Sequence, residues 1–126
     1  MLLVCRYRVA PADAGAFTTR ARRAIELLTA QPGCRAATVA RATEDDQTWL
    51  LVAEFDSVNA YRRALSPFDV REHVVPLLSE SDASGPSTFE SLLVGARGAI
   101  TVRPSVIAAD AGEVGVGEAA GPARPR

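Results

Sequence analysis

The chain begins with alternating apolar and polar residues, LLVCRYRV at positions 2–9. Because successive side chains of a strand point to opposite sides, this alternation predicts a strand that buries one face. From Pro11 the spacing becomes helical, and a single apolar stripe consists of Phe17, Ala21, Ala24, Ile25 and Leu28. Pro32 and Gly33 end the predicted helix, since proline cannot continue it and glycine tolerates the turn.

Residues 34–42 and 48–55 are two further apolar segments, separated by the polar turn 43–47. They predict a hairpin, and the second strand is apolar on both faces, which is typical of a central strand covered on both sides. Ser57 is a suitable N-cap for a short helix that ends near residue 65. The predicted inward residues of that helix are Val58, Tyr61 and Leu65.

A further helix is expected from about Asp69, with a kink or a short final turn at Pro76 because proline interrupts the hydrogen-bond ladder. The predicted inward residues of this helix are Val70, His73, Val74, Leu77 and Leu78. Residues 88–94 complete the pattern as a last strand. This order of elements, βαββαβ, predicts an α+β, ferredoxin-like fold: an antiparallel four-stranded sheet in the order 4-1-3-2, with helices on one face.

The strand at 48–55 has a second apolar face, which helices on the first face leave uncovered. A second copy of the chain that packs sheet against sheet is the simplest cover. The pattern therefore predicts a homodimer.

The composition changes near Gly95, and the rest of the chain is rich in alanine, glycine and proline without aromatic residues. We therefore expect a folded domain over residues 1–95 and a tail over 96–126. Residues 99–107 hold enough β-branched side chains for one more short strand, interrupted by Pro104, which would pair with a sheet edge of a partner subunit. From Asp110 onward there is too little bulky apolar content to offset the ordering entropy, so this part is expected to be disordered.

The charges are nearly balanced, with 14 basic and 15 acidic residues and a formal net charge of −1. Nucleic-acid binding is not expected, because contacts to phosphates usually require a strong basic excess. No apolar run approaches the ~20 residues that span a bilayer. Arg6 and Arg8 interrupt the apolar N-terminal stretch, which rules out a signal peptide. We expect a cytoplasmic protein without nucleic-acid or membrane partners.

The chain contains no lysine, which excludes Schiff-base chemistry and a lysine-containing phosphate loop. Cys5, Cys34 and the single histidine, His73, show no spacing that would hold a metal ion. A disulfide is not expected either, because the two cysteines fall on strands that are not adjacent in the predicted sheet. The sequence thus predicts two free thiols and no metal.

Several short motifs resemble one known family. Gln31-Pro32-Gly33 leads into the second strand, Glu54-Phe55-Asp56-Ser57 ends the third, and His73 lies in the helix before the last strand. Together these motifs resemble the antibiotic biosynthesis monooxygenase family of dimeric α/β-barrel proteins over residues 1 to about 94. Two departures are Phe55-Asp56-Ser57, where relatives often have Trp-Glu-Ser, and Cys34, which replaces an aromatic residue.

The resemblance implies an α/β barrel built by two sheets and an oxygenase without metal, flavin or haem. Haem degradation is not expected, because Tyr7 and Arg63 stand where the haem-degrading branch has asparagine and tryptophan. The implied substrates are small phenolic or quinol-type aromatics, polyketide-like, that react with dioxygen. In this hypothesis His73 is the base, and Tyr7 and Arg63 orient the oxyanion. The substrate-binding candidates are Cys5, Trp49, Phe68 and Phe89.

Each candidate has a plain structural alternative. His73 would then be a partly buried histidine bonded to the backbone, Tyr7 a packing residue with a satisfied hydroxyl, and Arg63 part of a solvated face. Trp49 would serve core or interface packing. The alternative function is a non-catalytic small-molecule-binding or accessory dimer of the same fold. The two readings differ in whether His73 and Tyr7 line a pocket between sheet and helices, or whether side chains simply fill that space.

Overall fold

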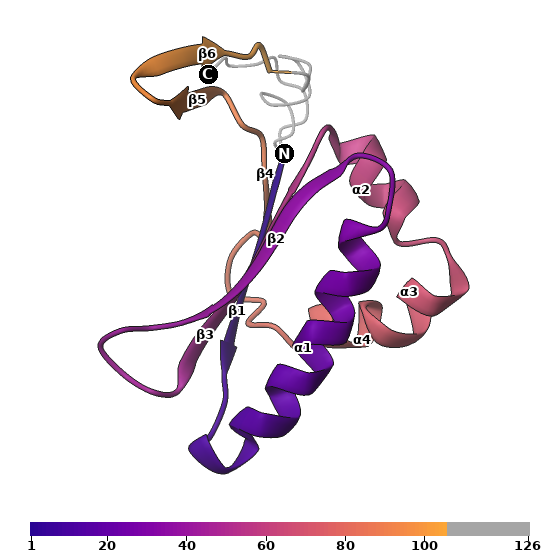
Figure 1. Cartoon of the computed structure of the whole chain (residues 1–126), viewed down its shortest axis with the longest axis vertical. Helices are drawn as coiled ribbons and strands as arrows, with labels where there is room; N and C mark the ends of the chain where they lie inside the picture. Colours follow the sequence, from indigo (N-terminus) through magenta and orange to yellow (C-terminus); the bar gives the residue numbers. More distant parts are fainter. Residues whose placement is uncertain (106–126) are drawn as a thin grey trace, which may run out of the picture. The chain divides into compact units, whose positions relative to one another are not determined.

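The computed structural model describes residues 1–105. The elements, shown in Figure 1, are β1 (Leu2–Arg8), a 3₁₀ turn (Pro11–Asp13), α1 (Ala14–Thr29), β2 (Cys34–Arg41), β3 (Thr48–Phe55), α2 (Val58–Ala64), α3 (Phe68–His73), α4 (Val75–Ser79), β4 (Thr88–Phe89), β5 (Leu93–Ala96) and β6 (Ala99–Val102). They fall into two units, Met1–Phe89 and a second that begins at Glu90, and each is described by itself.

The first unit contains an antiparallel four-stranded sheet in the order β2-β3-β1-β4. This is the predicted 4-1-3-2 order, and the predicted α+β, ferredoxin-like fold is confirmed. The register of β1 against β3 places Cys5 opposite Leu51 and Tyr7 opposite Trp49. All four of these side chains share the face of the sheet that the helices cover (Figure 1).

The core lies between that face and the helices. The predicted stripe of α1 is buried at Phe17, Ala21, Ala24 and Leu28, with Ile25 half-buried beside it. Val70, Val74 and Leu77 come from the later helices and are fully buried against the stripe and the sheet. The largest buried side chain of the sheet, Phe55, packs edge-on against Tyr61 with ring centroids 5.3 Å apart. Side chains thus fill the layer between sheet and helices.

The turn at Gly33 is required by geometry. Its φ is +86°, and an added Cβ would lie 2.6 Å from the Cβ of Ala60. Glycine alone adopts this conformation without strain and lets α2 approach the turn closely. The predicted N-cap is also present, since the backbone N–H of Ala60 donates to Oγ of Ser57 at 3.0 Å. In α2 the fully buried residues are Ala60 and Ala64, whereas the three predicted inward residues are only half-buried.

The helix expected from Asp69 is interrupted next to Pro76, in agreement with the predicted kink or short final turn: it is divided into α3 and the short α4. The break falls at Val74, and Pro76 lies in the first turn of α4. Proline has no N–H to donate and clashes with the carbonyl four residues earlier, so it is tolerated where a helix begins rather than inside one.

The predicted last strand at 88–94 is wrong in its extent. β4 covers Thr88 and Phe89, which pair with Leu3 and Leu2 of β1.

In the second unit β5 pairs with β6, from Leu93 opposite Val102 to Ala96 opposite Ala99. The expected strand in residues 99–107 is present as β6, and within the chain it pairs with β5. The expected pairing with a sheet edge of a partner subunit stays a prediction. The turn consists of Arg97 and Gly98, both with positive φ, which is the geometry of a tight hairpin. The last two residues of the expected strand, and the part predicted to be disordered, lie outside the described residues.

Candidate functional site

His73 is the last residue of α3 and is exposed, with 44% of its side chain accessible to solvent. The prediction that it lies on the inward face is therefore wrong. A helix turns about 100° per residue, so the inward positions of Val70 and Val74 leave residue 73 on the flank. Nε2 of His73 is 3.6 Å from Oε1 of Glu72. The imidazole lines a small groove of about 90 Å³ with Arg20, Arg23, Glu72 and Pro76.

Tyr7 is buried in the core, with 5% of its surface exposed. Its hydroxyl donates a hydrogen bond of 2.9 Å to the backbone carbonyl of Leu77, and its ring packs against Phe17 with centroids 5.0 Å apart. Burial raises the pKa of Tyr7 above its ordinary value, because the phenolate would lose its hydration. Its hydroxyl is therefore already bonded within the core.

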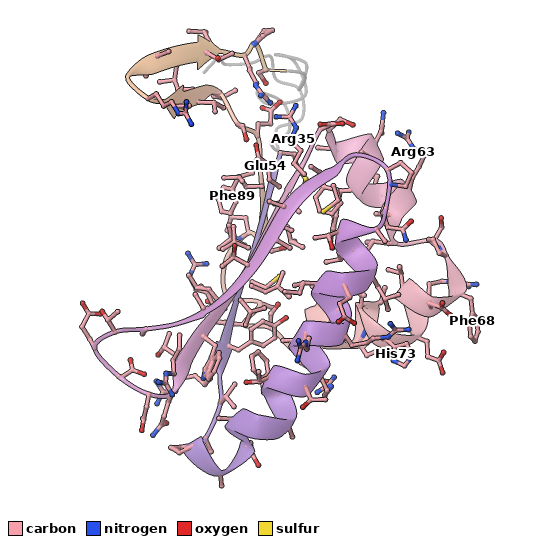
Figure 2. All side chains as sticks on the ribbon, viewed as in Figure 1. Arg35, Glu54, Arg63, Phe68, His73 and Phe89 are labelled. Atoms are coloured by element: carbon pink, nitrogen blue, oxygen red, sulfur yellow. The ribbon has the colours of Figure 1, made fainter. Side chains whose placement is uncertain are left out.

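The remaining candidates lie in several places. Arg63 is exposed on α2 and Phe68, 68% exposed, begins α3; Figure 2 shows Arg63, Phe68 and His73 well separated from one another. Phe89 is 40% exposed on β4, on the face of the sheet opposite Tyr7, since it pairs with Leu2. Cys5 is buried, and burial raises the pKa of its thiol. The three predicted catalytic residues do not converge within the chain.

Two candidates line larger grooves. Tyr7 lines one of about 380 Å³ together with Arg6, Arg8, Thr48, Glu80 and Asp82. The groove at Trp49 has a volume of about 320 Å³ and lies between α1 and the strands β2 and β3. Its lining residues define what we call the Trp49 groove: Thr18, Ala21, Arg22, Ile25, Val39 and Trp49. The four residues from α1 recur at the spacing of one helical face.

Two contacts hold the indole of Trp49. Phe17 packs against it edge-on at a centroid distance of 5.4 Å, and the guanidinium of Arg41 lies 5.6 Å from the centre of its ring. Arg41 faces Trp49 directly in the register of β2 and β3. Such a cation over an indole ring is attracted by the electron-rich face. The indole N–H is different, because Nε1 is shielded from solvent and has no hydrogen-bond acceptor.

The sequence analysis missed Arg22, Arg41 and Val39 at this place. Val39 and Arg41 could have been found from the predicted hairpin. The turn 43–47 sets the register of its two strands, and this register brings residue 41 opposite residue 49. Arg22 had no distinguishing signal, since it is one of three neighbouring arginines on a helix with an exposed face.

Among the described residues no cluster of histidine, cysteine and acidic side chains could hold a metal ion. Within the same part of the chain, no helix has the length and apolar character needed to cross a membrane. Both thiols are free, with Cys5 buried and Cys34 half-buried.

The sheet order and the helices on one face define a small ferredoxin-like α+β protein. A sequence profile described as antibiotic biosynthesis monooxygenase matches residues 1–74. The chain belongs to this family. The match ends at α3, so α4, β4 and the second unit lie beyond it.

Solved structures agree with this assignment. A variant of SnoaB, a cofactor-independent oxygenase from Streptomyces nogalater, is similar at 27% identity with a TM-score of 0.55; the likeness covers 64% of this chain and 82% of that one. A conserved protein from Methanosarcina mazei Go1 matches at 20% identity and a TM-score of 0.56, over 67% of this chain and 82% of that one, and supports the fold alone. A search of curated protein sequences finds no significant match.

Proposed function

We propose that this protein is a monooxygenase that oxidises a small phenolic or quinol-type aromatic with dioxygen and without a cofactor. The observation that carries the proposal is its membership of the family, together with the likeness to a cofactor-independent oxygenase at 27% identity. The polyketide-like character of the substrate rests on the family resemblance.

The reaction needs no external electron source when the substrate is electron-rich. A base removes a proton from an activated methylene carbon, and the resulting carbanion reduces dioxygen. One oxygen atom enters the product as a carbonyl group, and the other leaves as water with the two methylene hydrogens. The protein supplies the base, a donor that stabilises the oxyanion, and protection from bulk water.

His73 is the proposed base. It is the single histidine of the chain, its imidazole is accessible, and the guanidinium groups of Arg20 and Arg23 line the same groove. Positive charge beside a phenolic substrate favours its anion. Tyr7 and Arg63 are proposed only as more remote contributors, because the first already donates to Leu77 and the second lies on another helix.

The test is dioxygen uptake by metal-free and flavin-free protein with anthrone and with a simple quinol. We expect turnover, and we expect His73→Ala to lower it about 100-fold or more, the range of general base catalysis. Arg63→Gln is the comparison variant and should reduce turnover far less. Full turnover by the His73→Ala variant would remove the base assignment and leave the oxygenase proposal intact.

The second candidate function is a non-catalytic small-molecule-binding protein of the same fold. One observation favours it: His73, Tyr7 and Arg63 are dispersed and do not line a common groove. This function would be supported if neither probe caused dioxygen uptake and if either probe raised the melting temperature of the protein. A ligand at 100 times its dissociation constant adds about 2.7 kcal/mol.

In either function we propose a homodimer formed through the uncovered face of the sheet. On that face Leu2, Val4, Leu50 and Val52 are half-buried, and no helix of the described residues covers them (Figure 1). Sedimentation or light scattering at micromolar concentration measures the mass directly. Val52→Glu, in the middle of the face, should give a monomer, whereas Thr19→Glu on the exposed side of α1 should leave the mass of a dimer.

A further inference from the structure

One residue that lines the Trp49 groove, Trp49 itself, has an unsatisfied buried donor. Buried polar groups are almost always hydrogen-bonded, and a donor without an acceptor costs about 1–3 kcal/mol. Among the described side chains that are not exposed, Nε1 of Trp49 is the one buried nitrogen or oxygen atom without a partner. Its neighbours in the groove, Ala21, Ile25 and Val39, offer no side-chain acceptor. An acceptor oxygen supplied by a ligand would satisfy this N–H.

Positive charge borders the same groove. Arg22 lines it with a side chain that is 80% exposed, and Arg41 lies over the indole ring. The one ion pair of Arg22 in the described residues is a contact of 3.9 Å with Glu26, which also lies 3.8 Å from Arg23. Such an exposed and shared pair holds a side chain weakly. The guanidinium of Arg22 is therefore free to turn toward an anion in the groove.

The apolar lining and the volume indicate a flat, mainly apolar ligand. The floor consists of small and aliphatic side chains beside an indole, and about 320 Å³ is sufficient for a single aromatic ring with substituents. Because Nε1 is shielded from solvent, a ligand oxygen reaches it only when a neighbouring side chain moves. Arg22, which lines the groove, and Arg41, which lies over the indole ring, have long, exposed side chains that can change conformation.

We infer that the Trp49 groove binds a small planar aromatic anion, whose carboxylate or phenolate oxygen accepts from the indole N–H of Trp49 and from the guanidinium of Arg22. This site is separate from the proposed base. Arg22 and Ile25 lie on one flank of α1, and Arg20 and Arg23 of the His73 groove lie on the other. The inference therefore goes beyond the proposed oxygenase function and stands whether or not the protein consumes dioxygen.

Trp49 is the only tryptophan of the chain, so its fluorescence reports this groove alone. Salicylate is the probe, and salicylamide is its neutral counterpart of nearly equal shape. We expect saturable quenching of Trp49 by salicylate and at least tenfold weaker binding of salicylamide, because a hydrogen bond to a charged group is roughly twice as strong as a neutral one. Quenching that rises linearly without saturation, or equal affinity for the two probes, would overturn the inference.

Two exposed arginines provide a matched pair of variants. Arg22→Gln should weaken salicylate binding about tenfold or more, whereas Arg62→Gln on α2, which lines neither the Trp49 groove nor the His73 groove, should not change it. Each variant removes one exposed positive charge, so general charge effects are alike in the two proteins. Equal losses in both variants would show that the charge acts from a distance and that no groove site exists.

The indole donor is tested by Trp49→Phe, which retains an aromatic ring and removes the N–H. Because fluorescence is lost, binding is measured by isothermal titration calorimetry, with circular dichroism to verify the fold. We expect a several-fold loss of salicylate affinity. Unchanged affinity in a folded Trp49→Phe protein would contradict the role of the N–H. If this variant does not fold, the comparison of Arg22→Gln with Arg62→Gln alone decides the inference.

Discussion

The sheet-and-helix unit buries its large apolar residues, whereas the β5–β6 hairpin exposes them. In the first unit Leu3, Leu51 and Phe55 are at most 1% exposed, since α1, α3 and α4 supply a cover within the same chain. In the hairpin Leu93, Ile100 and Val102 are 65% to 72% exposed. The register places these three on one face of the hairpin, because Leu93 pairs with Val102 and Gly95 with Ile100.

This difference in burial indicates where each unit obtains its stability. A layer of helices on a four-stranded sheet buries enough apolar surface to be stable by itself, whereas an isolated two-stranded hairpin is marginal in water. The tight turn at Arg97 and Gly98 determines the shape of the hairpin but does not cover its apolar side chains. The hairpin therefore depends on apolar surface that it does not itself contain.

The largest effect is expected in the core of the first unit. Phe55→Ala removes a fully buried ring and should lower the free energy of unfolding by about 3–5 kcal/mol. Phe68→Ala removes a ring that is 68% exposed and should change it by less than about 0.5 kcal/mol. Urea unfolding followed by circular dichroism measures both, and similar losses would contradict the distribution of burial.

Two glycines of the first unit provide the next contrast. Gly33→Ala should cost about 1–3 kcal/mol, because φ is +86° and the new Cβ would meet Ala60 at 2.6 Å. Gly15 has nothing within 4 Å of an added Cβ and lies in α1, so Gly15→Ala should stabilise by several tenths of a kcal/mol. Thermal melts of the two variants should shift in opposite directions; shifts of the same sign would contradict the strained turn.

Shortening the chain tests the hairpin. Ending it after Gly95 removes β6 and should weaken the proposed dimer about tenfold without changing the unfolding of the first unit, since β4 pairs only with β1. Ending it after Asp110 should leave both quantities unchanged. Sedimentation over a concentration series measures the dimer constant, and identical behaviour of the two truncated proteins would show that the hairpin contributes nothing to association.

The smallest effect is expected at the surface. Arg20 donates two hydrogen bonds, of 2.9 and 2.8 Å, to the carboxylate of Glu80, which lowers the pKa of Glu80. A lowered folded-state pKa means that this stabilisation is present above the unfolded value of 4.5 and is lost as the pH falls below it. Because both side chains are about half exposed, less than about 1 kcal/mol is expected.

Melting temperatures between pH 7 and pH 3 measure this effect. The difference between the natural protein and Glu80→Gln should shrink as the pH falls, whereas Glu44→Gln in the exposed turn should follow the natural protein throughout. A difference that grows toward low pH would contradict the sign.

The candidate site was predictable only in part. Trp49, His73 and Tyr7 stand out in the sequence because they are rare residues in strongly patterned segments. Their surroundings depend on rotation about a helix and on packing. Because Val70 and Val74 take the inward positions, His73 lies on the flank of α3 and faces solvent. Because Leu77 offers its carbonyl, Tyr7 is bonded in the core. The six residues of α3 are too few for apolar periodicity to determine which side of the helix faces the core.

The sequence by itself determined the order of elements, the four-stranded sheet in the order 4-1-3-2 and the stripe of α1, because these follow from local periodicity, turn residues and the handedness of crossovers. Only the tertiary structure determined where β4 ends, that β5 pairs with β6, and which side chains line the Trp49 groove. These features depend on partners that are distant in the chain: the first residue of β1, the register of β2 with β3 and the flank of α1. Local pattern contains no information on contacts of that kind until the sheet has brought the segments together.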